Sequence, residues 1–151
     1  METNDNCIFC QIVKGQAPAH VVYRDSHFVA LLDIFPMRPG HILVVSLAHA
    51  KRLENLSDSA LQILLPLCNK IVKAQRASGL GLAGTNFLVN DGKGANQHIP
   101  HFHIHLVPRT GGDLLQVAFG YIARGFNFFG RKKRAKVLEK LALKIKNHLA
   151  V

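Results

Sequence analysis

The first part of the chain alternates between short apolar runs and turn residues, a pattern that predicts β-strands. Segments 21–23 and 28–32 flank an Arg-Asp-Ser turn, and the apolar segment 41–46 follows a loop with two prolines and a glycine. Segments 85–90 and 101–108 have the same strand-like character. Because sequential strands joined by short connections usually pair with each other, the five segments predict an antiparallel sheet.

Two other segments place apolar residues at helical spacing. The first runs from about Asp58 to Ser78, with Ser57 as the capping residue and glycines just after its end. Its predicted apolar stripe comprises Leu61, Leu64, Leu65, Cys68, Ile71 and Val72. Near the carboxyl terminus the stripe comprises Leu138, Leu141, Ile145 and Leu149. The whole pattern predicts an α+β fold, an antiparallel sheet of about five strands with a central helix and a basic C-terminal helix.

The composition is that of a globular protein. The chain has 151 residues, of which 48% are hydrophobic and 19% charged, enough for one domain with a core. It begins without a basic segment followed by an apolar one, and no uncharged apolar run reaches the roughly 18 residues of a membrane span. An odd count of three cysteines argues against a disulfide framework. We therefore expect a soluble, cytoplasmic protein with reduced thiols and no membrane partner.

The net charge of +10 is concentrated in the C-terminal segment, where eight Lys or Arg residues after Gly130 face one acid, Glu139. We expect a domain over residues 1–110 and a C-terminal extension over 111–151 that packs on the same domain. The basic segment could bind nucleic acid, but charge runs are usually solvated and no aromatic residues alternate with these charges. Nucleic-acid binding is therefore possible but not favoured, and concentrating an anionic substrate is a third option.

The segment "HFHIHLVPR" contains the most informative pattern in the chain. On an extended strand, His101, His103 and His105 share one face, while Phe102 and Ile104 point to the other. The rise per residue would place neighbouring imidazoles about 7 Å apart. A solvated face or a metal site are alternatives, but a straight row converges poorly on one ion. Imidazole is also a nucleophile and proton carrier near neutral pH, which favours a catalytic role.

The segment "HFHIHLV" matches the motif His-φ-His-φ-His-φ-φ, where φ is apolar. Together with "CIFCQIVKGQAPAHVVYRD", "LLDIFPMRPGHILVVS" and "NDGKGANQ", it resembles the histidine-triad (HIT) family over about residues 7–110. The resemblance is to the bacterial nucleotide hydrolases and the nucleotide-binding phosphoramidases of that family. It implies that His103 attacks the α-phosphorus and forms a nucleotidyl-histidine that water then hydrolyses. It also implies that His105 holds the phosphate and passes protons, His101 orients its neighbour, and His41 supports the triad.

The same resemblance implies a set of substrate contacts. Asp33 falls where the family binds the ribose hydroxyls, and Ile34 where the base pocket is lined. Asn90 and Gln97 fall at positions that contact phosphate or ribose. Without the resemblance, Asp33 and Asn90 are better explained as turn residues at strand ends than as substrate ligands.

Two positions depart from the family pattern. His98 stands where Ser or Thr is common, and Asn96 replaces a common Gly. The departures leave the reaction class unchanged and the leaving group open. We expect a purine nucleotide phosphoramidase or hydrolase that forms a homodimer, as such relatives commonly do. The alternatives are a dinucleoside-polyphosphate hydrolase, or a nucleotide-sensing module whose basic tail contacts RNA or protein.

The segment "CIFC" contains a Cys-x-x-Cys pair, which is a moderate signal for zinc. A tetrahedral site needs two further ligands, and the resemblance implies that His49 and His101 join Cys7 and Cys10. The predicted cofactor is thus a structural Zn²⁺ rather than a catalytic one. The alternative is that the two cysteines are small buried residues. Cys68, on the apolar stripe of the predicted helix, is expected in the core.

Overall fold

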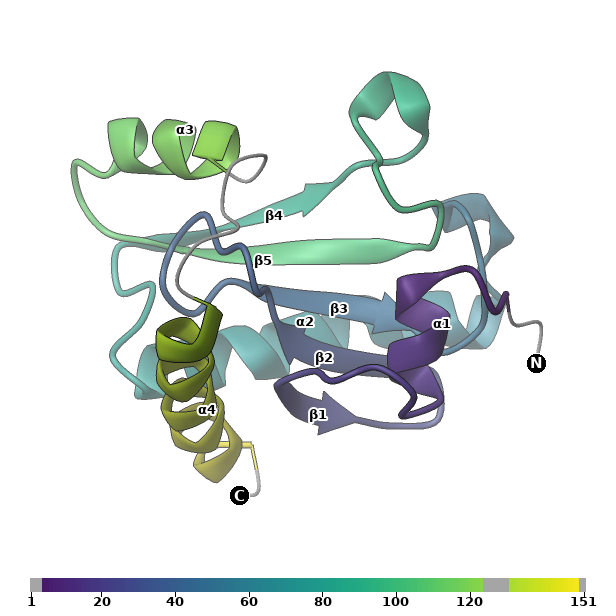
Figure 1. Cartoon of the computed structure of the whole chain (residues 1–151), viewed down its shortest axis with the longest axis horizontal. Helices are drawn as coiled ribbons and strands as arrows, with labels where there is room; N and C mark the ends of the chain where they lie inside the picture. Colours follow the sequence, from purple (N-terminus) through teal and green to yellow (C-terminus); the bar gives the residue numbers. More distant parts are fainter. Residues whose placement is uncertain (1–3, 124–130, 150–151) are drawn as a thin grey trace.

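The computed structural model describes residues 4–123 and 131–149 (Figure 1). The elements follow in the order α1 (Ile8–Val13), β1 (Val21–Arg24), β2 (Phe28–Leu32), β3 (Ile42–Ser46), α2 (Asp58–Ala77), β4 (Gly84–Val89), β5 (His103–Arg109), α3 (Leu114–Ala123) and α4 (Arg131–Asn147), with short 3-10 turns at Leu53–Asn55 and Lys93–Ala95. The five strands form one antiparallel sheet in the order β1-β2-β3-β5-β4. The predicted α+β fold is confirmed.

The two faces of the sheet carry different layers. Figure 1 shows α1 in front of the strands and α2 behind them. On the α2 side, Phe28, Ile42 and Ile104 belong to the larger core cluster, whereas Leu31 and Leu43 belong to a smaller cluster that includes α1. Alternate residues of β2 and β3 therefore divide between the two clusters, as the two-residue period of a strand requires.

Two helices lie where the sequence pattern predicted none. The helix α1 is only six residues long, too short for a helical period to stand out. The helix α3 has the sequence LLQVAFGYIA, which is apolar almost throughout and so shows no contrast between two faces. None of the described helices is long and apolar enough to cross a membrane.

The buried stripe of α2 differs in part from the predicted one. Ser57 caps the helix as expected, because its Oγ accepts the N–H of Ala60 at 3.3 Å. Leu61 and Leu65 are 39% and 65% exposed and were placed wrongly in the stripe. The buried face instead passes through positions 60, 64, 67, 68, 71, 72, 74 and 75. Leu61 and Leu65 each follow a buried residue directly, and one residue turns the helix by about 100°.

The C-terminal helix α4 packs on the domain through one apolar face. Leu138, Ala142, Ile145 and Leu149 are buried in the same core cluster as α2, and α4 contacts β1, β2 and α2. The lysines of α4 at positions 136, 140, 144 and 146 are exposed. The apolar residues of α4 are therefore used for packing, and these four lysines face solvent.

Candidate active site and metal centre

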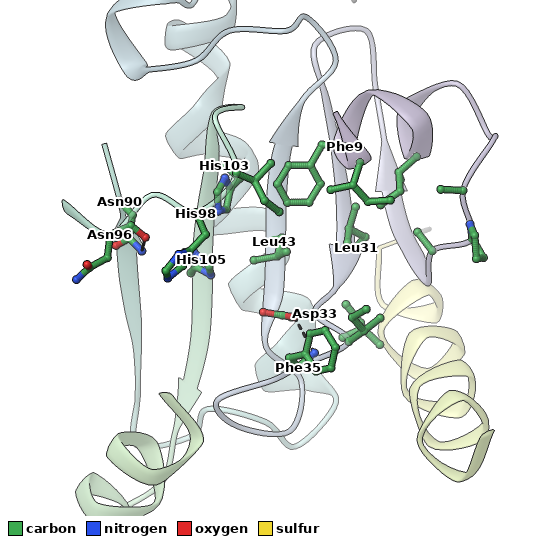
Figure 2. A pocket seen from close by; sticks show the side chains of 18 residues that line it. Phe9, Leu31, Asp33, Phe35, Leu43, Asn90, Asn96, His98, His103 and His105 are labelled. Carbon is green, nitrogen blue, oxygen red and sulfur yellow. Dashed lines mark hydrogen bonds between the residues drawn. The ribbon is translucent and has the colours of Figure 1, made fainter. Parts of the chain in front are cut away.

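A cavity of about 530 Å³ opens on the α1 side of the sheet. Its polar lining consists of Asp33, Asn90, Asn96, His98, His103 and His105. Its apolar lining comes from α1, from β2 and β3, from the loops that follow α1 and β2, and from Ile99 in the loop before β5. Figure 2 shows the imidazoles and the two asparagines on one side of the cavity, with Phe9 and Leu31 on the other. The cavity thus has one polar and one apolar side.

The histidines of β5 do not form the even row that an ideal strand predicts. The strand begins at His103, because His101 lies in a bend whose N–H donates to Ile99 O at 2.8 Å. The rings of His103 and His105 approach to 4.9 Å between centroids, closer than the spacing expected from the strand rise. Only these two triad histidines line the cavity, and His101 is buried behind them.

The hydrogen bond of His103 determines which of its ring nitrogens is protonated. Its Nδ1 lies 2.8 Å from the carbonyl oxygen of His101, which can only accept. The Nδ1–H therefore donates, and Nε2 has the lone pair in the neutral ring. The ring packs against Phe9 at 5.0 Å between centroids and is 7% exposed. In its neutral form, His103 therefore has its basic nitrogen at Nε2.

A second chain of hydrogen bonds orients His105. The backbone N–H of Met37 donates to Nδ1 of His41 at 3.2 Å, which leaves the proton of neutral His41 on Nε2. That Nε2 is 2.9 Å from Nδ1 of His105, so His41 donates and His105 has its own proton on Nε2. Asp33 lies beside this pair, with Oδ2 at 3.4 Å from His41 Nδ1 and Oδ1 accepting the N–H of Phe35 at 2.8 Å. His105 can therefore present a proton donor beside the basic nitrogen of His103.

Four potential metal ligands converge behind the cavity. The Sγ of Cys7 is 3.4 Å and that of Cys10 is 3.6 Å from Nδ1 of His101, and Nδ1 of His49 is 3.3 Å from both Cys10 Sγ and His101 Nδ1. Ligand atoms of a tetrahedral zinc site lie about 3.3 to 3.8 Å apart. All three cysteines of the chain are free and buried. The donor set and its spacing fit a tetrahedral Zn²⁺.

His101 is also protonated in the way that a metal ligand requires, with one ring nitrogen free of a proton. Its Nε2–H donates to the carbonyl of Ser46 at 2.8 Å, which leaves the Nδ1 lone pair directed at the cysteines. Burial lowers the pKa of His101 to about 4, so the ring is neutral near neutral pH. Burial likewise raises the pKa of the Cys10 thiol, so a metal that binds there displaces a proton.

The remaining predicted substrate residues divide into two groups. Ile34, Asn90 and His98 line the cavity. The side chain of Gln97 instead stabilises the loop before β5, because its Oε1 accepts the N–H of Gly92 at 2.9 Å and its Nε2 donates to Lys51 O at 2.7 Å. A substrate contact by Gln97 stays a prediction.

Several cavity residues escaped the sequence reasoning. Phe9 contacts the rings of both His101 and His103, yet it lies in a helix that was not predicted. Its position inside the Cys-x-x-Cys segment could have indicated it, because both cysteines were expected beside His101. Leu31 and Leu43 were expected in strands, but only the register Leu43↔His105 places Leu43 beside the triad.

Comparison with known proteins agrees with this geometry. The model of the HIT domain matches residues 14–112, which is more than half of the chain. The His-x-His-x-His motif of that family falls at residues 101–105 of this chain, and two of its histidines line the cavity. The chain belongs to the HIT, or histidine-triad, family.

Individual relatives extend the match beyond the motif. An uncharacterized HIT-like protein of Methanocaldococcus jannaschii is 40% identical over 116 residues, which cover 77% of this chain and 88% of that protein. The adenosine 5'-monophosphoramidase hnt1 of Schizosaccharomyces pombe is 38% identical over 104 residues, 69% of this chain and 74% of that protein. A zinc-bound histidine triad family protein from Mycobacterium smegmatis superposes with a TM-score of 0.71 at 33% identity, over 94% and 96% of the two chains.

Proposed function

We propose that the protein hydrolyses a purine nucleoside phosphoramidate, or a related nucleotide, through a covalent intermediate on His103. The observation that supports this proposal most directly is the hydrogen bond from His103 Nδ1–H to His101 O, which leaves Nε2 as the nucleophilic nitrogen in a nucleotide-sized cavity. The name of the fission yeast relative, adenosine 5'-monophosphoramidase, supports the same reaction class.

The proposed reaction has two displacements. Nε2 of His103 attacks the α-phosphorus, the bond from phosphorus to the leaving nitrogen breaks, and the leaving amine departs with a proton that Nε2–H of His105 passes on from solvent. Water then attacks the phosphorus of the nucleotidyl-histidine and releases a proton to solvent by way of His105. The nucleotide leaves, and His103 is regenerated. Splitting one displacement in two lets one residue pair act first as acid and then as base.

The two sides of the cavity match the two parts of a nucleotide. The ribose hydroxyls would donate to Asp33, whose carboxylate is 4% exposed and lies next to the histidines. The base would occupy the apolar side, where Ile34 and Phe9 offer surface. Asn90 and His98 would face the phosphate and the leaving group from the opposite side.

Trapping the intermediate tests the proposal. The protein would be mixed with adenosine phosphoramidate, quenched in conditions that preserve phosphoramidate bonds, and analysed by intact mass and peptide mapping. We expect an adenylyl adduct on the peptide that contains His103, and none in His103→Ala. Turnover that persists in His103→Ala would contradict the mechanism.

A parallel assay distinguishes the alternative functions. Faster cleavage of dinucleoside polyphosphates than of phosphoramidates would indicate a dinucleoside-polyphosphate hydrolase. Nucleotide binding with no turnover of either substrate class would indicate a nucleotide-sensing module.

We further propose that Cys7, Cys10, His49 and His101 bind a structural Zn²⁺. The metal would tie α1 to the segment before β5 and so hold His101, whose carbonyl orients His103. The zinc-bound relative from Mycobacterium smegmatis supports this assignment. Metal analysis of the purified protein should find one zinc per chain.

A homodimer is also part of the proposal. The edge strand β4 exposes Phe87, Leu88 and Val89 at 45%, 39% and 40%, although these residues point alternately to the two faces of the sheet. An exposed apolar edge strand is suited to pairing with the same strand of a second copy. Light scattering after size exclusion should give twice the chain mass. A contribution of the basic tail to nucleic-acid binding stays possible and is not favoured.

A further inference from the structure

A glutamine lies in the centre of the core, on the side of the sheet opposite the cavity. Gln75 of α2 is fully buried, among residues that are otherwise apolar, such as Ile71 and Val72. Its Nε2 lies 2.8 Å from the carbonyl oxygen of Gly40 and 3.4 Å from that of Leu106. The amide therefore donates both of its protons to two backbone carbonyls that are far apart in sequence.

The two carbonyls belong to the neighbours of the paired histidines. Gly40 directly precedes His41, and Leu106 directly follows His105. The ladder between β3 and β5 ends at the pair Ile42↔Leu106, and the chain before Ile42 belongs to a loop. Gln75 therefore links the strand of one histidine to the loop of the other at the point where backbone pairing stops.

The buried amide is retained at a cost to stability. Its Oε1 has no hydrogen-bond partner among the described residues, and a buried acceptor left unpaired is unfavourable. Methionine would fill a similar volume without an unpaired polar atom. The distinctive contribution of Gln75 is thus its pair of donors and the two carbonyls that they hold.

The loop is seated closely on the end of α2 as well. Gly40 has a φ of +81°, and a Cβ at this position would lie 2.6 Å from Cδ1 of Leu80. A side chain at Gly40 would therefore be strained and would push Leu80 and the loop apart. The backbone approaches α2 closely enough for the Gln75 amide to reach Gly40 O.

We propose that Gln75 is a positioning residue that holds His41 and His105 at hydrogen-bond distance. The inference rests on the proposed function, since that function makes His105 the residue that transfers protons during turnover. Gln75 touches neither substrate nor the reacting atoms. It sets the 2.9 Å contact between His41 Nε2 and His105 Nδ1 by bridging the backbone next to each histidine.

A first test uses the unmodified protein and requires no substrate. In a ¹⁵N,¹³C-labelled sample, the two Nε2 protons of Gln75 should exchange slowly with solvent and couple through hydrogen bonds to the carbonyl carbons of Gly40 and Leu106. The Nε2 proton between His41 and His105 should also be visible. Rapid exchange of the Gln75 amide, or the absence of both couplings, would overturn the proposal.

A second test compares variants at a temperature at which circular dichroism shows all of them folded. In Gln75→Met the donors are removed, and in Gln75→Asn the shorter side chain holds them back from the carbonyls. We expect kcat to fall about tenfold in both, a part of the full general acid–base contribution, with KM nearly unchanged. We also expect the His41–His105 proton resonance to broaden or disappear.

The matched control is Val72→Ala, which removes buried volume from the same helix and no hydrogen bond to the loop. It should lower the melting temperature but keep kcat and the histidine resonance of the unmodified protein. If Gln75→Met behaves like this control, the role of Gln75 is structural only and the proposal is wrong. If no adduct forms on His103, the proposed function fails, yet the histidine resonance still reports on Gln75.

Discussion

The protein has two histidine clusters, to which we assign different roles. His49 and His101 belong to the proposed metal site, and His103 and His105 line the cavity. At the metal cluster, His101 donates its Nε2–H to Ser46 O and turns Nδ1 toward the cysteines. At the cavity, His103 donates Nδ1–H to His101 O, which leaves Nε2 as the basic nitrogen. Both rings donate an N–H to a backbone carbonyl. The choice of which nitrogen meets that carbonyl decides whether the other one serves a metal or a substrate.

The surroundings of the two clusters also fit a metal site in one case and a substrate site in the other. His101 is completely buried and close to two thiols, so four ligand atoms meet in a small closed volume. His103 and His105 line a cavity that also contains carboxylate, amide and apolar groups. A closed set of four ligands is typical of a structural zinc site, whereas an open cavity admits a substrate.

Replacing one histidine from each cluster should separate the two roles, with the largest effect at the cavity. We expect His103→Ala to lower turnover by about 10⁴-fold or more while zinc content and nucleotide affinity remain, since only the nucleophile is lost. The main effect of His101→Ala should instead be the loss of zinc. Steady-state kinetics with metal analysis of both proteins measures the difference. Equal loss of zinc in the two variants would show that the two clusters do not have separate roles.

Removing a thiol ligand should act mainly on stability. We expect Cys10→Ser to lose bound zinc and to melt about 10 °C lower, because metal-binding energy contributes to folding. A chelator should lower the melting temperature of the unmodified protein and have little effect on the variant. Cys68→Ala is the control, because burial raises the pKa of the Cys68 thiol to about 12 and it lies among apolar residues of α2. If Cys68→Ala also contained less zinc than the unmodified protein, the assigned ligand set would be wrong.

Loosening the support of His105 should have an intermediate effect on catalysis. In His41→Asn the contact with His105 Nδ1 is removed, so the proton position on His105 is no longer set. We expect kcat to fall by about 10 to 100-fold, up to the lower limit of a typical general acid–base contribution, with zinc content unchanged. His27→Asn, in the turn between β1 and β2, is the matched control and should retain full activity. An unchanged kcat in His41→Asn would show that His105 is oriented by other groups.

The smallest effect is expected at a charged cluster without histidine, at the other end of β5. Asp113 accepts from Arg109 at 2.6 and 2.9 Å and lies 3.3 Å from Arg38, and its pKa falls to about 2, first through the hydrogen bond from Arg109. A carboxyl group with a lowered pKa stabilises the fold above its ordinary pKa of 3.8, and this contribution is lost as pH falls toward 2.

Thermal melts at several pH values check the sign of this contribution. Asp113→Asn should melt lower than the unmodified protein near neutral pH, and the difference should shrink between about pH 4 and pH 2. The variant should keep its zinc, in contrast to Cys10→Ser. A difference that grows as the pH falls would contradict the assigned ion pairs.

Much of the fold was predictable because its signals are local. The strand 28–32, the capping residue Ser57 and the apolar spacing of α4 follow from alternation, cap chemistry and helical period. Family resemblance also anticipated Asp33 and His98 at the cavity. The six residues of α1 were not predicted, because so short a helix has almost no period to detect and is stabilised by packing against the sheet.

Other features depend on contacts between residues far apart in the chain. Gln75 was indistinguishable from any polar residue on a helix, and its burial follows only from the packing of α2 under Gly40 and Leu106. The two hydrogen bonds by which the Gln97 amide holds the loop before β5 were likewise not predictable, and its expected substrate contact stays a prediction. An amide side chain can donate and accept hydrogen bonds, so the sequence alone does not indicate which partners it has.

The order of residues alone determined the strands, the main helices and the grouping of His103 with His105, because backbone period and side-chain alternation act over a few positions. The three-dimensional arrangement decided which ring nitrogen of each histidine has the proton, at what spacing the four expected metal ligands converge behind the cavity, and how the loop with His41 meets β5. These outcomes depend on carbonyls and ligands contributed by distant segments, and only the folded chain brings those groups within hydrogen-bond distance.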